Sequence, residues 1–263
     1  MKLLFSLSVC LCLFISLSGS YLAHRTTVND PTLTVAAAPS HAAFDKLLKE
    51  HVNGSGMVNY RGFQKDKADL KAYTDMLAKN APSDSWSKDD QLAYWINAYN
   101  AFTIQLILDN YPVKSIKDIG SKIKIPFVNT PWDVKFIKLG GQTYDLNNLE
   151  HGIIRKKFDE PRIHFALVCA AKSCPRLRNE AFEGKRLNAQ LEDQGVDFLN
   201  DPTKNSVSAK QASLSKILDW YGGDFKKMKG KSINEVVNQF SKTKITDDTK
   251  ISYQTYNWSL NEQ

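Results

Sequence analysis

One segment, residues 91–110, constrains the fold more than any other, because a helix formed by its mostly apolar residues would have little surface suited to contact with water. Ser87 followed by Asp90 resembles a capping box, and Tyr111-Pro112 ends the segment, since proline cannot continue a helix. At about 100° per residue, one broad arc holds the large apolar side chains. These are Leu92, Trp95, Ile96, Tyr99, Phe102, Leu106 and Ile107. The sequence therefore predicts a helix that the rest of the chain covers on most sides.

Two asparagines interrupt this apolar surface. Asn100 falls inside the arc and Asn97 lies at its edge. A buried amide costs about 1 to 3 kcal/mol unless it is hydrogen-bonded, so we expect each side chain to have a specific partner. A backbone group of a neighbouring loop is the simpler partner, and a catalytic or ligand-binding role is the alternative.

Short extended pieces accompany the helices. Apolar residues between 44 and 77 recur at helical spacing on both sides of residues 57–60, which predicts helix, strand, helix. A hairpin is predicted where residues 134–139 and 142–145 flank Gly140-Gly141, because paired glycines accept the positive φ of a two-residue turn.

The C-terminal part is predicted to be helical. We expect helices at 187–199, at 214–221 with a stop at Gly222-Gly223, and from Ser232 onward. The 263 residues are 42% hydrophobic, enough for a core that needs no disulfide or metal. The sequence therefore predicts a single α+β domain, rich in helix, with a small mixed or antiparallel sheet.

The N-terminal residues are typical of a secretory signal. Lys2 precedes an apolar run at 3–17 and the small residues 18–20. A retained anchor is the alternative, but about 15 apolar residues fall short of the roughly 20 that a spanning helix needs. No later stretch is apolar enough to cross a bilayer, so we expect an exported protein, periplasmic or extracellular. The predicted parts are a signal peptide at 1–20, a linker at 21–42 and a globular domain at 43–263.

The charges do not indicate a particular partner. The net charge is +7, but the 35 basic and 28 acidic residues are interspersed along the chain. We therefore expect no nucleic-acid partner. The sequence also lacks a glycine-rich phosphate loop, a Gly-x-Ser-x-Gly elbow, a His-Glu-x-x-His motif and four-ligand metal spacing, so no cofactor or metal is predicted.

Glu150 and His151 lie on a predicted helix that Asn147 or Asn148 caps and that runs to about Phe158. Glu150 falls inside the apolar arc of this helix, with His151 at its margin. Buried glutamates are rare unless paired, so Glu150 should meet a cation, a histidine or backbone amides. An internal salt bridge with an arginine, such as Arg155 or Arg162, is as good an explanation as a role in a site.

Residues 162–177 carry the strongest indication of chemistry. Residues 163–168 form a short apolar run typical of a central strand, with His164 inserted in it. Pro175 favours the first position of a helix, which would make Cys174 the N-cap residue with a lowered thiol pKa. The alternatives are a disulfide between Cys169 and Cys174 or an inert loop thiol.

Several short motifs occur in a fixed order along the chain. They are Tyr94-Trp95-Ile96-Asn97-Ala98-Tyr99-Asn100-Ala101, Leu149-Glu150-His151, His164-Phe165-Ala166 running to Ser173-Cys174-Pro175, Trp220-Tyr221 with Asp224-Phe225, and Tyr256-Asn257-Trp258-Ser259-Leu260-Asn261. This set resembles the domain of unknown function 547 (DUF547) over about residues 44–261. The resemblance implies an exported bacterial protein, and it implies no substrate.

Two functions fit these residues. The first is cysteine-dependent acyl transfer or amide hydrolysis, with Cys174 as nucleophile, His151 or His164 as base, Glu150 orienting the imidazole, and Asn97 or Asn100 donating to an oxyanion. A buried helix followed by a histidine-bearing strand is similar to papain-like or transglutaminase-like cores, although here asparagines replace the helix cysteine.

The second function is a non-catalytic binding module of the cell envelope, in which the same polar residues hold loops in place. A histidine within hydrogen-bond reach of Cys174 in an open cleft would favour the enzyme. A sealed disulfide between Cys169 and Cys174 would favour the module.

Overall fold

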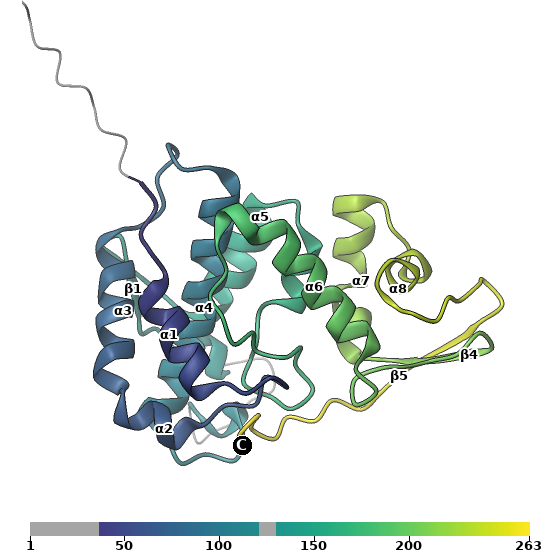
Figure 1. The fold of residues 1–263 in the computed structure, drawn as a ribbon, viewed down its shortest axis with the longest axis horizontal. Helices are drawn as coiled ribbons and strands as arrows, with labels where there is room; N and C mark the ends of the chain where they lie inside the picture. Colours follow the sequence, from purple (N-terminus) through teal and green to yellow (C-terminus); the bar gives the residue numbers. More distant parts are fainter. Residues whose placement is uncertain (1–36, 121–129) are drawn as a thin grey trace, which may run out of the picture. The chain divides into compact units, whose positions relative to one another are not determined.

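Helices make up most of the described chain (Figure 1). The computed structural model describes residues 37–120 and 130–263, which belong to one compact unit. The predicted signal peptide and most of the predicted linker lie outside these residues. The helices are α1 (Ala42–His51), α2 (Tyr60–Lys65), α3 (Lys67–Lys79), α4 (Lys88–Asn110), α5 (Arg155–Lys157), α6 (Leu187–Asn200), α7 (Lys216–Lys229) and α8 (Ile233–Phe240), with 3-10 turns η1 (Ile116–Asp118), η2 (Pro131–Asp133), η4 (Pro161–Phe165) and η5 (Gly184–Arg186) and the π-helix η3 (Asn148–Ile154).

Helix α4 is the buried helix that the sequence predicts. Its N-cap is Ser87, whose hydroxyl accepts the backbone N–H of Asp90 at 3.0 Å, and it ends directly before Tyr111-Pro112. Nearly every residue from Gln91 to Leu108 is buried, and α3 and η3 pack against it. The larger of the two hydrophobic clusters in the described residues is built around this helix.

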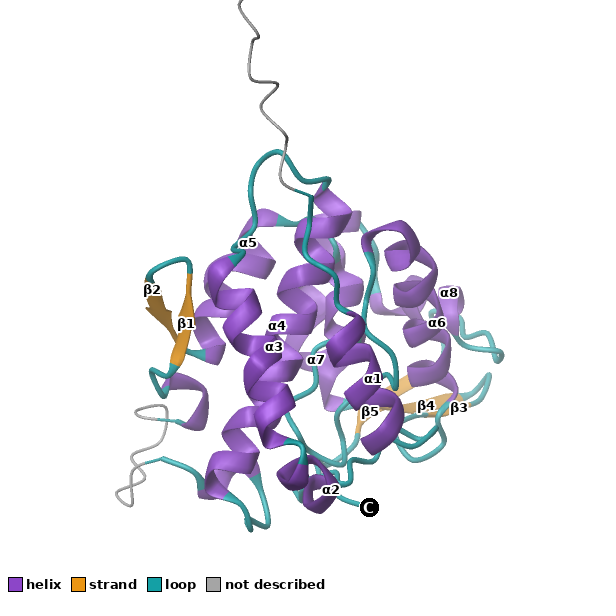
Figure 2. Cartoon of the chain, turned by 60° about the vertical axis from the view of Figure 1, so that its left-hand side comes forward, coloured by secondary structure: helices purple, strands orange, loops and turns teal. Residues whose placement is uncertain are grey.

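Strands occupy two small sheets, which Figure 2 shows apart from each other. Strands β1 (Ile137–Leu139) and β2 (Gln142–Tyr144) form the predicted antiparallel hairpin, with positive φ at both Gly140 and Gly141. The other sheet has the order β3-β4-β5, with β3 (Ser206–Val207) antiparallel and β5 (Lys250–Tyr253) parallel to β4 (Gln211–Leu214). The prediction of a helix-rich α+β fold is confirmed, although the structure has two small sheets in place of the single one predicted.

The predicted strand at residues 163–168 is wrong. His164 lies in the 3-10 turn η4, which begins at Pro161 and whose N-cap, Glu160, accepts the backbone N–H of Arg162 at 3.1 Å. The run is apolar because η4 lies between two hydrophobic clusters: Ile163 packs in the cluster around α4, and Phe165 packs in a second one with α6, α7 and α8. Burial on both sides imitates the pattern of a central strand. The order of elements that resembled a papain-like core is therefore absent from the described residues.

The predicted end of helix α7 at Gly222-Gly223 is wrong. The helix continues to Lys229. Helical glycines cost roughly 1 kcal/mol each relative to alanine. Burial of Leu218 and Phe225 on both sides of the pair offsets this cost, because both pack in the second cluster. The helix ends at Gly230, whose φ of 65° is the left-handed C-terminal conformation.

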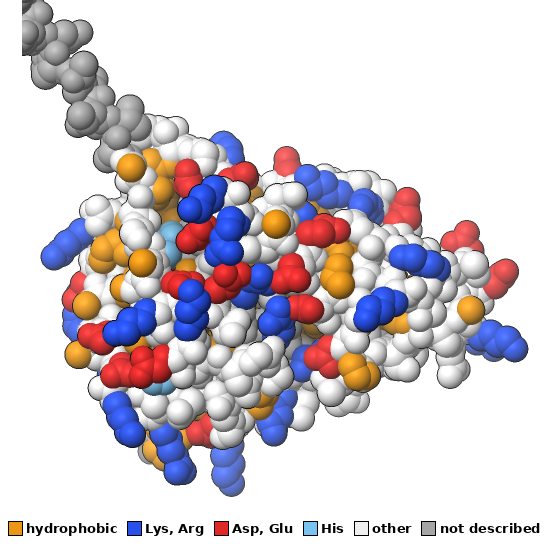
Figure 3. Space-filling view, in the orientation of Figure 1, with side chains coloured by type: hydrophobic (Ala, Val, Ile, Leu, Met, Phe, Trp, Pro, Cys, Tyr) orange, Lys and Arg blue, Asp and Glu red, His pale blue; other side chains and the backbone are white. Residues whose placement is uncertain are grey.

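The surface carries no single-sign field on the face that Figure 3 displays, since basic and acidic side chains alternate across it. Within the described residues, no helix has both the length and the apolar composition needed to cross a membrane.

Asn97 and Asn100 hold loops to the buried helix. Asn100 donates to the carbonyl of Ala166 and accepts the backbone N–H of Val168, both at 3.0 Å. Asn97 makes the corresponding pair of bonds with the carbonyl (2.8 Å) and the N–H (2.9 Å) of Phe182. Both asparagines are buried, so the prediction that each meets a backbone group of a neighbouring loop is confirmed.

We expect Asn100→Leu to lower the free energy of unfolding by about 2 to 4 kcal/mol, because it orphans two buried backbone groups that each cost about 1 to 3 kcal/mol. Chemical denaturation at pH 7 measures the effect. Asn80→Leu is the control, since Asn80 is exposed at the end of α3 and its loss should cost less than about 0.5 kcal/mol. Equal stability of the two variants would contradict the structural role of Asn100.

Candidate functional site

A cavity of about 300 Å³ brings together most of the candidate residues. Glu150 and His151 reach it from η3, His164 from η4, and Cys169 and Cys174 from the loop that follows. The aromatic lining residues are Tyr99, Trp132, Trp220, Tyr221, Tyr256 and Trp258. Asn97 and Asn100 do not line it. Residues from six separate stretches of sequence thus converge on one concave site.

The π-helix η3 directs Glu150 and His151 into the site. The sequence predicts an α-helix from residue 147 or 148 to 158, and the structure has the wider π-helix followed by α5. Such widened turns are rare in proteins, but those that occur are often found at functional sites.

The loop that carries both cysteines, residues 166–174, is called the cysteine loop below. The C-terminal segment, residues 254–263, holds it in place. Lys172 donates its N–H to the carbonyl of Ser259 (2.8 Å), and the carbonyl of Ala170 accepts the N–H of Asn261 (3.1 Å). Ala170 has a φ of 59°, a left-handed conformation that costs a non-glycine residue on the order of 1 kcal/mol. This turn reverses the chain, so Cys169 and Cys174 face the same space.

The prediction that Cys174 is a helix N-cap is wrong. Residues 175–183 are not helical, and the next helical turn is η5. The backbone after Pro175 is instead tied to α6, because Gln194 donates to the carbonyl of Arg176 at 3.1 Å. No helix N-terminus stabilises this thiolate.

Three polar groups converge on the sulfur of Cys174. The Sγ of Cys169 lies 2.7 Å away, a contact in which either thiol can donate, and the backbone N–H of Cys169 and the hydroxyl of Tyr256 donate to Cys174, each at 3.1 Å. Both cysteines are free.

These contacts split the two thiol pKa values. Burial by itself raises the pKa of the Cys174 thiol, but the hydrogen bonds from Cys169 and Tyr256 outweigh it and hold this pKa below its usual value. The pKa of Cys169 is raised well above its usual value, because its thiol hydrogen-bonds to Cys174 and is buried. These contacts therefore favour the thiolate form of Cys174 over that of Cys169.

His164 is held by a buried acidic partner. Its Nε2 lies 2.8 Å from Oδ2 of Asp224, and its ring stacks on Tyr221 with centroids 3.8 Å apart. Asp224 also accepts two hydrogen bonds from the guanidinium of Arg155, at 2.6 and 2.7 Å. Burial lowers the pKa of His164 despite the carboxylate, which favours the neutral imidazole. In the tautomer that donates its Nε2–H to Asp224, Nδ1 carries the lone pair.

Glu150 does not pair with Arg155 or Arg162, the arginines named above as its possible partners. It is buried and accepts the hydroxyl of Tyr221 at 2.7 Å, while Nδ1 of His151 lies 3.8 Å from its carboxylate. Burial and the neighbouring Glu150 raise the pKa of Tyr221, so this phenol remains a donor. The carboxylate thus faces the cavity without an arginine or lysine ion pair in the described residues.

Two observations were expected to separate an enzyme from a binding module: a histidine hydrogen-bonded to Cys174, or a disulfide between Cys169 and Cys174. The described residues show neither. Cys174 and both histidines share the cavity, but no histidine of the described residues hydrogen-bonds a cysteine. The two sulfur atoms are adjacent but not bonded as a disulfide.

Comparison with known proteins finds one family model that matches part of the chain. Residues 83–199 match the model of the family described as "Protein of unknown function, DUF547". This part of the chain is similar to a DUF547 domain. The match contains all six predicted site residues, whereas Asp224 and Tyr256, which contact them, follow it. No curated protein and no solved structure matches the chain.

Three partners of the site residues were not predicted: Tyr221, Asp224 and Tyr256. Arg155 was expected as a possible partner of Glu150, but it binds Asp224. The three unpredicted residues belong to motifs that carried the resemblance, Trp220-Tyr221, Asp224-Phe225 and the motif beginning at Tyr256. A polar residue within or beside the apolar arc of a helix is the sequence pattern that could have identified Asp224. Asp224 lies next to the buried Phe225 on α7, as Glu150 lies among the buried residues of η3.

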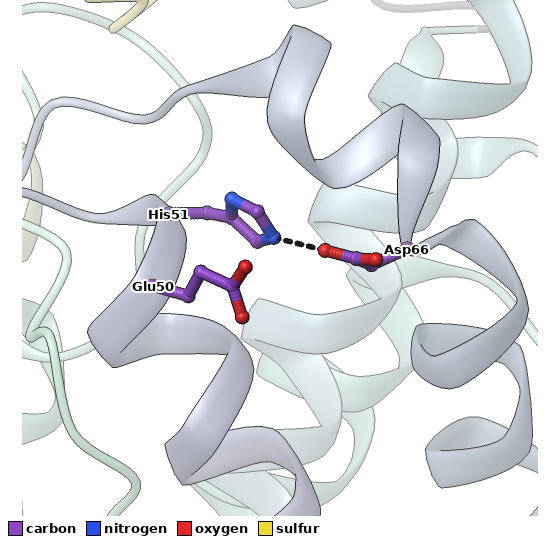
Figure 4. A group of neighbouring side chains, drawn as sticks. All are labelled: Glu50, His51 and Asp66. Atoms are coloured by element: carbon purple, nitrogen blue, oxygen red, sulfur yellow. Dashed lines mark hydrogen bonds and ion pairs between the residues drawn. The ribbon is translucent and has the colours of Figure 1, made fainter.

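A set of potential metal ligands lies away from this cavity (Figure 4). Glu50 and His51 at the end of α1 and Asp66 between α2 and α3 offer ligand atoms within 4.8 Å of one another, the only such group of three among residues 37–120 and 130–263. The 2.7 Å ion pair between His51 and Asp66 accounts for this arrangement without a metal. Glu150, His151, His164 and Cys174 do not form such a group.

Proposed function

We propose that the protein is a cysteine-dependent enzyme of acyl transfer or amide hydrolysis, with Cys174 as nucleophile. The observation that carries this proposal is the convergence of Cys169 and Tyr256 on the sulfur of Cys174 inside a cavity. A thiolate stabilised in this way needs no adjacent base to become nucleophilic.

In the proposed reaction, the thiolate of Cys174 attacks the carbonyl carbon of an ester or amide. The bond to the leaving group breaks as a thioester forms, and the leaving amine or alcohol takes up a proton. Water or an acceptor then attacks the thioester, loses a proton and releases the thiolate. His164, oriented by Asp224, is the residue we assign to these proton transfers. Asn97 and Asn100 hold loops rather than an oxyanion, because their amides are already bonded to backbone groups.

Acylation by p-nitrophenyl acetate tests the proposal. We expect the reduced protein to gain one acetyl group, which peptide mass spectrometry places on Cys174. Cys174→Ser should lose the adduct, and Cys169→Ser is the matched control, which should still be acylated on Cys174. An adduct confined to Cys169, or none on the folded protein, would contradict the assignment.

The aromatic lining of the cavity favours a second candidate, a non-catalytic binding module. In that case ligand would bind, but the reduced protein would not be acylated. The same experiment therefore separates the two candidates.

We propose further that the protein is exported to the periplasm or the extracellular space. Lys2 with the apolar run at 3–17 supports a cleaved signal. N-terminal sequencing of protein from the envelope or medium should find the first residue between about 19 and 39. An intact Met1 on that material would refute export by cleavage.

A further inference from the structure

Four aromatic side chains form one continuous wall of the cavity: Trp132, Trp220, Tyr256 and Trp258. The ring centroids of Tyr256 and Trp258 are 4.5 Å apart, those of Trp220 and Tyr256 4.9 Å, and those of Trp132 and Trp258 5.5 Å. Rings this close touch one another and leave no space between them for a ligand. The planes of these three pairs are inclined by 52°, 43° and 69°, so the cluster is a platform made of tilted rings rather than one plane.

The platform is fixed in place and is open at Trp220, whereas Lys117 Nζ lies 4.8 Å from the ring centroid of Trp258. The carbonyl of Trp258 accepts the hydroxyl of Ser115 at 2.7 Å, and the C-terminal segment is bonded to the cysteine loop. Trp220 nevertheless keeps 45% of its surface exposed, the largest exposure of any large hydrophobic residue in the described chain. An apolar surface held rigid and left uncovered at a cavity is typical of a ligand contact.

The polar residues of the cavity restrict the ligand. Asn147, Glu150 and His151 offer an amide, a carboxylate and an imidazole. No lysine or arginine is among the described residues that line the cavity, although Arg155 contacts His151 and Lys117 lies over the ring of Trp258. The carboxylate of Glu150 in the lining disfavours anionic ligands. A purely aromatic ligand would desolvate these polar groups and add no hydrogen bond to those they already make with Tyr221 and Arg155.

We infer that the cavity binds a saccharide ring, with its C–H face on the aromatic platform and its hydroxyl edge toward Asn147, Glu150 and His151. A pyranose ring has both surfaces that this cavity requires: an apolar face of C–H groups and an edge rich in hydroxyls. A volume of about 300 Å³ is at the lower end for ligand sites and suits one or two rings. The inference rests on the proposed function, since a ring seated here would present an acyl or amide substituent to Cys174.

Binding is tested in the Cys174→Ala protein, which cannot react. N,N′-diacetylchitobiose is the probe, and isothermal titration with tryptophan fluorescence gives its Kd. We expect saturable binding that Trp220→Ala weakens about tenfold, since one aromatic contact is removed. Tyr253→Ala is the matched control, because Tyr253 is an exposed aromatic residue outside the cavity lining, and its loss should leave the Kd unchanged.

The outcomes separate this inference from the proposed function. Saccharide binding without acylation of the wild-type protein would uphold the inference and reject the enzyme. Acylation of Cys174 without saccharide binding would do the reverse. Binding of N-acetylphenylalaninamide in place of the saccharide, or saccharide binding that Trp220→Ala leaves unchanged, would overturn the inference.

Discussion

Replacing Asp224 with asparagine is expected to lower the free energy of unfolding at pH 7 by about 3 kcal/mol. The carboxylate accepts hydrogen bonds from both Arg155 and His164, and its loss leaves the guanidinium without its partner in a mostly buried position. Chemical denaturation measures the change. Asp219→Asn on the same helix is the control, because its ion pair with Lys216 is exposed and should contribute less than about 1 kcal/mol.

The effect of Asp224→Asn should also depend on pH. The hydrogen bond from His164, together with that from Arg155, holds the pKa of Asp224 well below its usual range. A carboxyl group whose folded pKa is lowered stabilises the fold above its unfolded pKa of about 3.9, and this contribution is lost as the pH falls further. The difference between wild type and variant should therefore be constant from about pH 5 to 7 and shrink below about pH 4. A difference no larger than that of Asp219→Asn would contradict the role of this carboxylate.

The elements that could be predicted are those whose signals are local. Helix α4 has a cap at Ser87, a stop at Tyr111-Pro112 and an apolar surface all around. The hairpin has its glycine pair, and α8 has the predicted start at Ser232, where Glu235 completes a capping box. In each case neighbouring residues alone decide the conformation.

The elements that could not be predicted depend on tertiary contacts. His164 lies in a run that reads as a strand because two hydrophobic clusters meet at η4, and no local pattern separates this from a sheet. Pro175 permits a helix after Cys174, but hydrogen bonds to α6 hold that backbone in another conformation. Propensity is a weak prior, and packing overrode it at both places.

Several residues that line the cavity could be predicted by type, but their partners could not. Glu150, His151, His164 and Cys174 do line one cavity. Their partners come from far along the chain: Asp224 is 60 residues from His164, and Tyr256 is 82 residues from Cys174. Sequence spacing carries no information about such contacts, which arise only when α7 and the C-terminal segment pack against the cysteine loop.

The central claim is that Cys174 is a stabilised thiolate, and its reaction with iodoacetamide should show this. Only the thiolate reacts, so the rate follows the fraction that is ionised. The hydrogen bonds from Cys169 and Tyr256 favour the charged form of Cys174, and the hydrogen bond to Cys174 together with burial disfavours that of Cys169. The pKa of Cys174 should therefore lie below that of an ordinary cysteine, and the pKa of Cys169 above it. Tyr256→Phe removes one donor and should move the profile of Cys174 toward higher pH.

The most direct measurement is the pH dependence of alkylation at each cysteine, read by peptide mass spectrometry on the fully reduced protein. We expect the rate at Cys174 to reach half of its maximum below about pH 8.5, the value of an ordinary thiol, while Cys169 reacts only at higher pH. A profile for Cys174 centred at or above pH 8.5, or a Cys169–Cys174 disulfide that forms completely and resists reduction in a periplasm-like redox buffer, would contradict the account.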